Sequence, residues 1–60
     1  MKSLKDRLKE FHEKEGISYK YIANYLEVST GVMYNFTSGI RDLKPPIRQA
    51  LEEYLEDMGY

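Results

Sequence analysis

Hydrophobic residues recur at the spacing of an α-helix in four separate stretches of this chain. The first stretch follows Ser3, a residue type that caps helix N-termini, and it precedes Gly16, a residue type at which helices end. Its apolar stripe is Leu4, Leu8 and Phe11. We therefore expect a helix between Ser3 and Gly16, after which Ile17 returns to the core.

Two shorter segments follow, and each is introduced by a serine. Ser18 is expected to cap a helix of about two turns, and Ser29 a third helix over residues 29–38 that stops at Gly39. Only residues 27–29 separate the two helices. The side chains predicted to face the core are Ile22, Ala23 and Leu26 in the second helix, and Val32, Met33 and Phe36 in the third.

The last segment predicts the most regular helix. Pro46 suits a first helical turn because its missing N–H has no partner there in any helix. The apolar positions that follow are Ile47, Ala50, Leu51, Tyr54, Leu55 and Met58, which form one stripe. The sequence shows no strand-length alternation, linker or internal repeat. We predict an all-α fold, with four short helices on one core and a single domain over residues 1–60.

Composition narrows the class of protein. The absence of Cys excludes disulfides, Cys-based zinc sites and thiol nucleophiles, and it favours an intracellular, cytoplasmic location. No apolar run approaches the ~18 residues of a membrane span, so no membrane role is expected. With 42% hydrophobic residues and a formal net charge of −1, the chain is expected to fold.

Charge is distributed unevenly along the chain. Residues 1–48 carry all nine basic residues against six acidic ones, whereas residues 49–60 carry four acidic residues and no basic one. The C-terminal end is therefore a poor surface for a polyanion, and any nucleic-acid contact is expected in the first 48 residues.

Two short helices joined by a three-residue turn are the helix-turn-helix arrangement. Residues 17–41 resemble the Cro and phage-repressor family, the lambda-repressor-like or XRE-type DNA-binding domains. The residues that carry the likeness are Ala23 as the small residue between the helices, Val28 and Ser29 as turn and cap, Met33 and Phe36 as the buried face, and Ser38, Gly39, Ile40 and Arg41 as the closing segment. The likeness covers under half of the chain, and its helix-turn-helix motif lies at residues 18–38.

This resemblance implies a compact four-helix, lambda-repressor-like domain that regulates transcription, as a phage or bacterial repressor does, and needs no cofactor. Its partner would be double-stranded DNA, with helix 29–38 in the major groove. Asn35 is the strongest candidate, because Asn can make a bidentate contact to adenine and so favour A·T pairs. The base-reading positions map onto Thr30, Gly31, Tyr34 and Asn35.

Because helix 29–38 has no Lys or Arg, we expect affinity to come from phosphate contacts on its flanks. The candidates are Ser18, Tyr19, Lys20, Ser38, Arg41 and Lys44. This is a modest set, so a lone monomer is expected to bind weakly, and a homodimer on a two-fold site or a longer parent protein is expected.

The sequence departs from the family pattern in two positions of the motif. Glu27 occupies a turn position that is often Gly, so a positive φ there would be mildly strained. Tyr19 replaces a common Gln at the second position of its helix, although its hydroxyl can still reach a phosphate. Neither departure excludes the motif.

Two other classes of function were weighed. An enzyme is disfavoured because the single histidine, His12, has no second metal ligand one turn away and is expected at the surface, and because the C-terminal carboxylates are expected to face solvent. A protein-interaction module on the same scaffold is the alternative. Six Tyr in 60 residues favour it, and each candidate residue also has an ordinary reading as a solvated or packing side chain.

Overall fold

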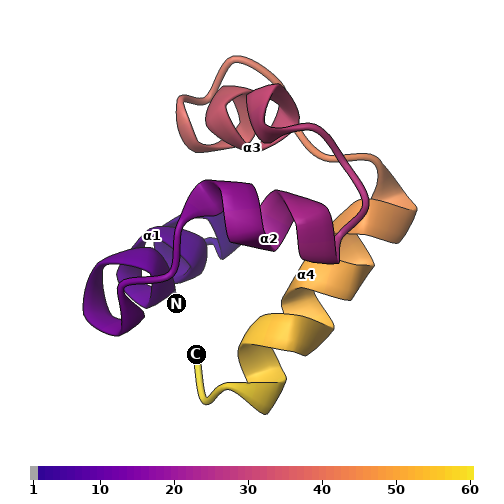
Figure 1. Cartoon of the computed structure of the whole chain (residues 1–60). Coiled ribbons are helices and arrows are strands. Elements are labelled where there is room, and N and C mark those ends of the chain that lie inside the picture. Colours follow the sequence, from indigo (N-terminus) through magenta and orange to yellow (C-terminus); the bar gives the residue numbers. More distant parts are fainter. Residues whose placement is uncertain (1) are drawn as a thin grey trace.

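Four helices make up the computed structural model of the chain, which describes residues 2–60 (Figure 1). They are α1 (Leu4–Glu15), α2 (Tyr19–Tyr25), α3 (Thr30–Thr37) and α4 (Pro45–Asp57), and no strand occurs in the described part. The predicted all-α class is confirmed. Helix α2 packs on α3 with the chain reversing between them, while α1 contacts both α3 and α4.

The predicted helix starts are confirmed by side-chain hydrogen bonds. The hydroxyls of Ser3, Ser18 and Ser29 accept from backbone N–H groups three residues further along, at 3.2–3.3 Å. Helix α4 begins at Pro45, so Pro46 lies in the first helical turn as predicted, and no side chain caps the helix. Two prolines fit there because the first helical turn does not use their missing N–H groups.

One cluster of buried residues draws on all four helices. The fully buried side chains are Leu8, Ile22, Met33, Leu51 and Leu55. The cluster holds every residue predicted for the α1 and α2 stripes, and Ile17 packs at its edge as expected. Helix α3 is therefore held by its buried face, and its opposite face is exposed to solvent.

Two residues predicted to face the core are exposed instead. Val32 is 38% exposed because the short α3 buries only a narrow face, in which Thr37 takes a place through its hydroxyl bond to the Tyr34 carbonyl. Met58 is 50% exposed because it follows the last turn of α4, where Tyr60 N–H bonds back to the Leu55 carbonyl. Periodicity predicted the stripe correctly but not where the core ends.

The loop between α3 and α4 is held by two contacts that the sequence reading did not predict. Leu43 is buried in the core. The Asp42 carboxylate accepts from the Leu43 N–H and from the Arg48 guanidinium, both at 2.8 Å. The loop is therefore held at Asp42 and Leu43, just before α4 begins.

Candidate nucleic-acid interface

The turn between α2 and α3 depends on one left-handed residue. Glu27 has a φ of 59°, the positive value anticipated for a position that is often Gly. The Glu27 N–H donates to the Asn24 carbonyl and the Val28 N–H to the Ala23 carbonyl, at 3.2 and 2.9 Å. These two bonds are the Schellman pattern, which closes a helix and reverses the chain. The turn is therefore well formed despite the side chain on Glu27.

Close packing of α2 on α3 fits the small residue between them. Ala23 is fully buried, and the two helices lie in direct contact. Val28 also packs against the core, which ties the turn down. The pair is thus a rigid helix-turn-helix unit, with α3 as its outer member (Figure 1).

The outer face of α3 carries the four residues predicted to read bases. Gly31 and Tyr34 are exposed, and Thr30 and Asn35 are half-buried at the edges. A Cβ added at Gly31 would meet only the Ser29 hydroxyl, 3.9 Å away, so the surface there is open. None of the four is buried within the core, so all four remain accessible from outside.

A groove runs from α3 to the start of α4 and connects Asn35 with two cations. It has a volume of about 430 Å³ and is lined by Val28, Ser29, Val32, Asn35, Arg41, Asp42, Leu43, Lys44 and Ile47. The Asn35 carbonyl accepts from the Ile40 and Arg41 N–H groups, at 3.0 and 3.3 Å. The backbone of Arg41 therefore lies directly beside the last turn of α3.

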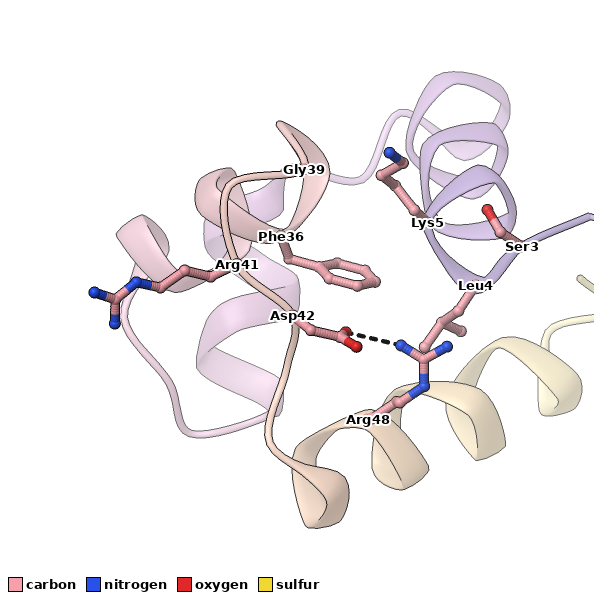
Figure 2. Close-up of a pocket in the computed structure, with 8 residues that line it drawn as sticks. All are labelled: Ser3, Leu4, Lys5, Phe36, Gly39, Arg41, Asp42 and Arg48. Atoms are coloured by element: carbon pink, nitrogen blue, oxygen red, sulfur yellow. Dashed lines mark hydrogen bonds and ion pairs between the residues drawn. The ribbon is translucent and has the colours of Figure 1, made fainter.

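Three basic residues near the helix-turn-helix unit are not paired with an acid. Arg41, Lys44 and Lys20 are exposed and form no ion pair with any residue from 2 to 60. Arg48, by contrast, contacts Asp42 at 2.8 Å. Figure 2 shows the Arg41 side chain pointing away from that pair. The positive charge beside α3 is therefore available to an external anion.

The start of α2 approaches α3 through aromatic rings. Tyr19 stacks on His12, with ring centroids 4.1 Å apart, and meets the Tyr34 ring edge-on at 5.7 Å. Burial, and secondarily the charge of Glu13, raises the pKa of Tyr19. The Tyr19 ring is thus a packing element that joins the start of α2 to α1 and α3, and its neighbours Ser18 and Lys20 are exposed.

The predicted surface position of His12 is wrong. The ring is half-buried, and its Nδ1 is hydrogen-bonded to the Ile17 carbonyl, so Nδ1 carries the proton because a carbonyl can only accept. Within residues 2–60, no group of three or more His, Asp or Glu side chains is placed to hold a metal ion. His12 joins the end of α1 to the start of α2.

One basic residue near α3 was missed by the sequence reading. Lys5 of α1 points toward the close of α3, and its Nζ lies 3.7 Å from where a Cβ on Gly39 would stand (Figure 2). Ser38 precedes that glycine and is exposed. The contact joins residues 34 positions apart, so no local pattern in the sequence could have revealed it.

Comparisons with known proteins identify no relative. No protein-family model, no curated protein and no solved structure matches the chain. No helix among residues 2–60 has the length and apolar character needed to cross a membrane. The class supported by the coordinates is therefore that of a small all-α domain containing a helix-turn-helix unit.

Proposed function

We propose that the chain is a sequence-specific DNA-binding domain of a transcriptional regulator that lays α3 in the major groove of double-stranded DNA. The observation that carries the proposal is the exposed, uncharged face of α3 with unpaired cations beside it. Arg41 and Lys44 share a groove with Asn35, and Lys20 follows Tyr19, whose ring meets the Tyr34 ring of α3 edge-on. Lys and Arg side chains that form no internal ion pair can bind DNA phosphates.

Reading and anchoring are divided between different residues in this mechanism. The Asn35 amide donates to adenine N7 and accepts from adenine N6, a pairing worth about 1–3 kcal/mol of discrimination. Gly31 lets the helix backbone approach the bases, and the Thr30 methyl meets a thymine methyl. Arg41, Lys44, Lys20 and the hydroxyls of Ser18 and Ser38 contact phosphates, which orients α3. Bound in this way, the domain regulates transcription by occupying its site.

An interaction module without DNA binding is the second candidate. The groove beside α3 has apolar walls formed by Val28, Val32 and Ile47, and Ile40 nearby is 70% exposed. Such a surface also suits an apolar protein segment. The two candidates differ in their response to salt, because phosphate contacts release counterions and apolar contacts do not.

Fluorescence anisotropy against a random duplex pool at several salt concentrations tests the proposal. Arg41→Gln and Lys44→Gln are each expected to weaken binding and to lower the slope of log K against log salt by about 0.9. Lys9→Gln is the matched control, because Lys9 is exposed, forms no ion pair within residues 2–60 and lies on α1 beside Glu10 and Glu13. Binding that is insensitive to salt, or equal losses in all three variants, would overturn the proposal.

A further inference from the structure

The groove between α3 and the start of α4, here called the α3–α4 groove, has basic and apolar walls. In the proposed DNA complex, Arg41 and Lys44 of this groove bind phosphates. Val32 is 38% exposed, so apolar surface inside the groove is open to water. Four apolar residues of the groove have no role in that complex: Val28, Val32, Leu43 and Ile47.

The charge of the α3–α4 groove is positive and is not neutralised from within. Among residues 2–60, Asp42 is the acidic residue that lines it, and its carboxylate already accepts from the Arg48 guanidinium at 2.8 Å. Glu27 lies in the turn next to the groove and does not line it. Arg41 and Lys44 are exposed and form no ion pair with any residue from 2 to 60. Figure 2 shows Arg41 pointing away from the Asp42–Arg48 pair, so its guanidinium is available to a carboxylate.

The size of the groove indicates what can enter it. Its volume of about 430 Å³ lies near the lower end of the range for ligand sites, about 300–1,000 Å³. A space of this size receives a few side chains and not a whole helix. An occupant from another protein would therefore lie across the groove and insert the side chains of one face.

Charge and polarity together select the chemistry of that face. A DNA phosphate pairs with Arg41 or Lys44 but leaves the apolar walls in contact with water. A wholly apolar segment covers the walls but takes water from two cations without pairing them, which is costly. A segment with apolar side chains at its centre and carboxylates beside them satisfies both kinds of wall.

A second copy of the chain suits the groove less well than a separate protein does. The acidic segment that it could offer is the end of α4, which holds four acidic residues and no basic one after residue 48. That segment does not line the groove, so the two contacting surfaces would be different ones. Contacts of this kind do not close into a two-fold dimer but build rings or filaments. A separate acidic segment fills the groove of a single domain.

We propose that the α3–α4 groove binds an acidic amphipathic helix of another protein, and that this helix excludes DNA. The docking itself does not depend on DNA binding. The exclusion rests on the proposed function, because Asn35, Arg41 and Lys44 would be used by both partners. In a regulator, the acidic protein would release the domain from its DNA site.

Amide chemical shifts of the ¹⁵N-labelled 60-residue chain test the docking. The probe is a synthetic peptide of Leu and Glu, spaced so that all Leu lie on one face of a helix. Shifts are expected to change at Val32, Asn35, Leu43 and Ile47 and to stay unchanged across α1. The control peptides are the same residues in scrambled order and the same pattern with Lys in place of Glu. Neither control is expected to bind at a concentration at which the probe saturates the chain.

Two pairs of variants separate the apolar and the charged contributions. Val32→Thr replaces one methyl group by a hydroxyl of similar size and is expected to weaken peptide binding about fourfold, the value of one buried methyl group. Ile40→Thr is its control, because Ile40 is 70% exposed and does not line the groove. Lys44→Gln is expected to weaken binding about threefold at low salt, whereas Lys9→Gln on α1 is expected to leave it within error. Thermal unfolding of each variant establishes that it is folded.

Fluorescence anisotropy of a labelled duplex pool tests the exclusion. The Leu–Glu peptide is expected to release the duplex from the chain, and the scrambled peptide of the same charge is not. Val32→Thr is expected to require about fourfold more peptide for the same release and to bind DNA alone as tightly as the native chain. If the chain binds the duplex but not the peptide, this inference alone fails. If the chain does not bind the duplex, the proposed function and the exclusion fail, and the amide shifts still decide the docking.

The docking is overturned by any of the following results. Equal binding of the Lys peptide or the scrambled peptide would show that the groove does not select an acidic amphipathic helix. Equal losses in Val32→Thr and Ile40→Thr, or shifts confined to other elements, would place the peptide outside the groove. Concentration-dependent shifts of the groove residues without peptide, together with a higher mass in sedimentation, would assign the groove to a second copy.

Discussion

Glu27 is the residue at which the sequence and the turn geometry conflict most directly. Its φ of 59° costs a residue with a Cβ about 1–2 kcal/mol. Glu27→Gly would remove this cost. The greater freedom of Gly stabilises the unfolded chain, which would offset about 0.4–1 kcal/mol of the gain. The net expectation is a gain of about 0.5–1 kcal/mol, which for a domain of this size raises Tm by roughly 2–8 °C.

The exposed carboxylate of Glu27 forms no ion pair within residues 2–60, so its loss should not offset the gain. Urea and thermal unfolding followed by circular dichroism at 222 nm measure the effect. Glu27→Ala is the matched control, because it removes the charge and keeps the Cβ. If the Ala variant gains as much as the Gly variant, or the Gly variant gains nothing, the explanation by left-handed strain is wrong.

Three further predictions concern α3, the core and the exposed charges. Gly31→Ala is expected to stabilise the fold by about 0.5 kcal/mol, because the added methyl group meets open space and Ala favours helices. The same variant is expected to bind DNA more weakly. Urea unfolding measures the stability and fluorescence anisotropy measures the DNA affinity. Leu51→Ala, at a fully buried position, is expected to cost about 2–5 kcal/mol and leave much of the chain unfolded at 37 °C, which circular dichroism would show. Hydrogen bonds from Lys14 and then Lys2 lower the pKa of Glu10 to about 2, from 4.5, so its ionised form stabilises the fold above pH 4.5 and this contribution disappears as the pH falls to about 2. Glu10→Gln should therefore lower the urea midpoint at pH 7 and lower it much less at pH 2, where about half of the Glu10 side chains are protonated. A deficit as large at pH 2 as at pH 7 would contradict this account.

The helix boundaries could be predicted because the signals for them are local. Each capping serine lies within three residues of the N–H that it binds, and Gly16 and Gly39 adopt the left-handed conformation that ends a helix. Whether a side chain at or beyond the end of an apolar stripe is buried depends on which other helix or loop packs against it. Val32 and Met58 have no such neighbour, and Leu43 is buried although it belongs to no stripe.

The candidate interface was predictable to a similar extent. The motif spacing predicted an accessible outer face on α3, and the four candidate reading residues lie there. The spacing did not predict that the Asn35 carbonyl would hold the Arg41 backbone, or that Asp42 would pair with Arg48. Nor did it predict the packing of Tyr19 on His12 or the approach of Lys5 to Gly39, because each of these contacts joins two different elements of the fold. Side-chain pairing between elements is a property of the folded chain.

The central claim is that an uncharged helix face reads base pairs while flanking cations supply affinity. Selection of binding sites from a random duplex library, carried out in parallel with the native chain and with Asn35→Ala, tests it most directly. The account predicts that the native chain enriches a short motif containing A·T pairs, and that the variant binds the pool but loses the preference at one adenine. Failure of the native chain to enrich any motif, or recovery of the same motif by Asn35→Ala, would contradict it.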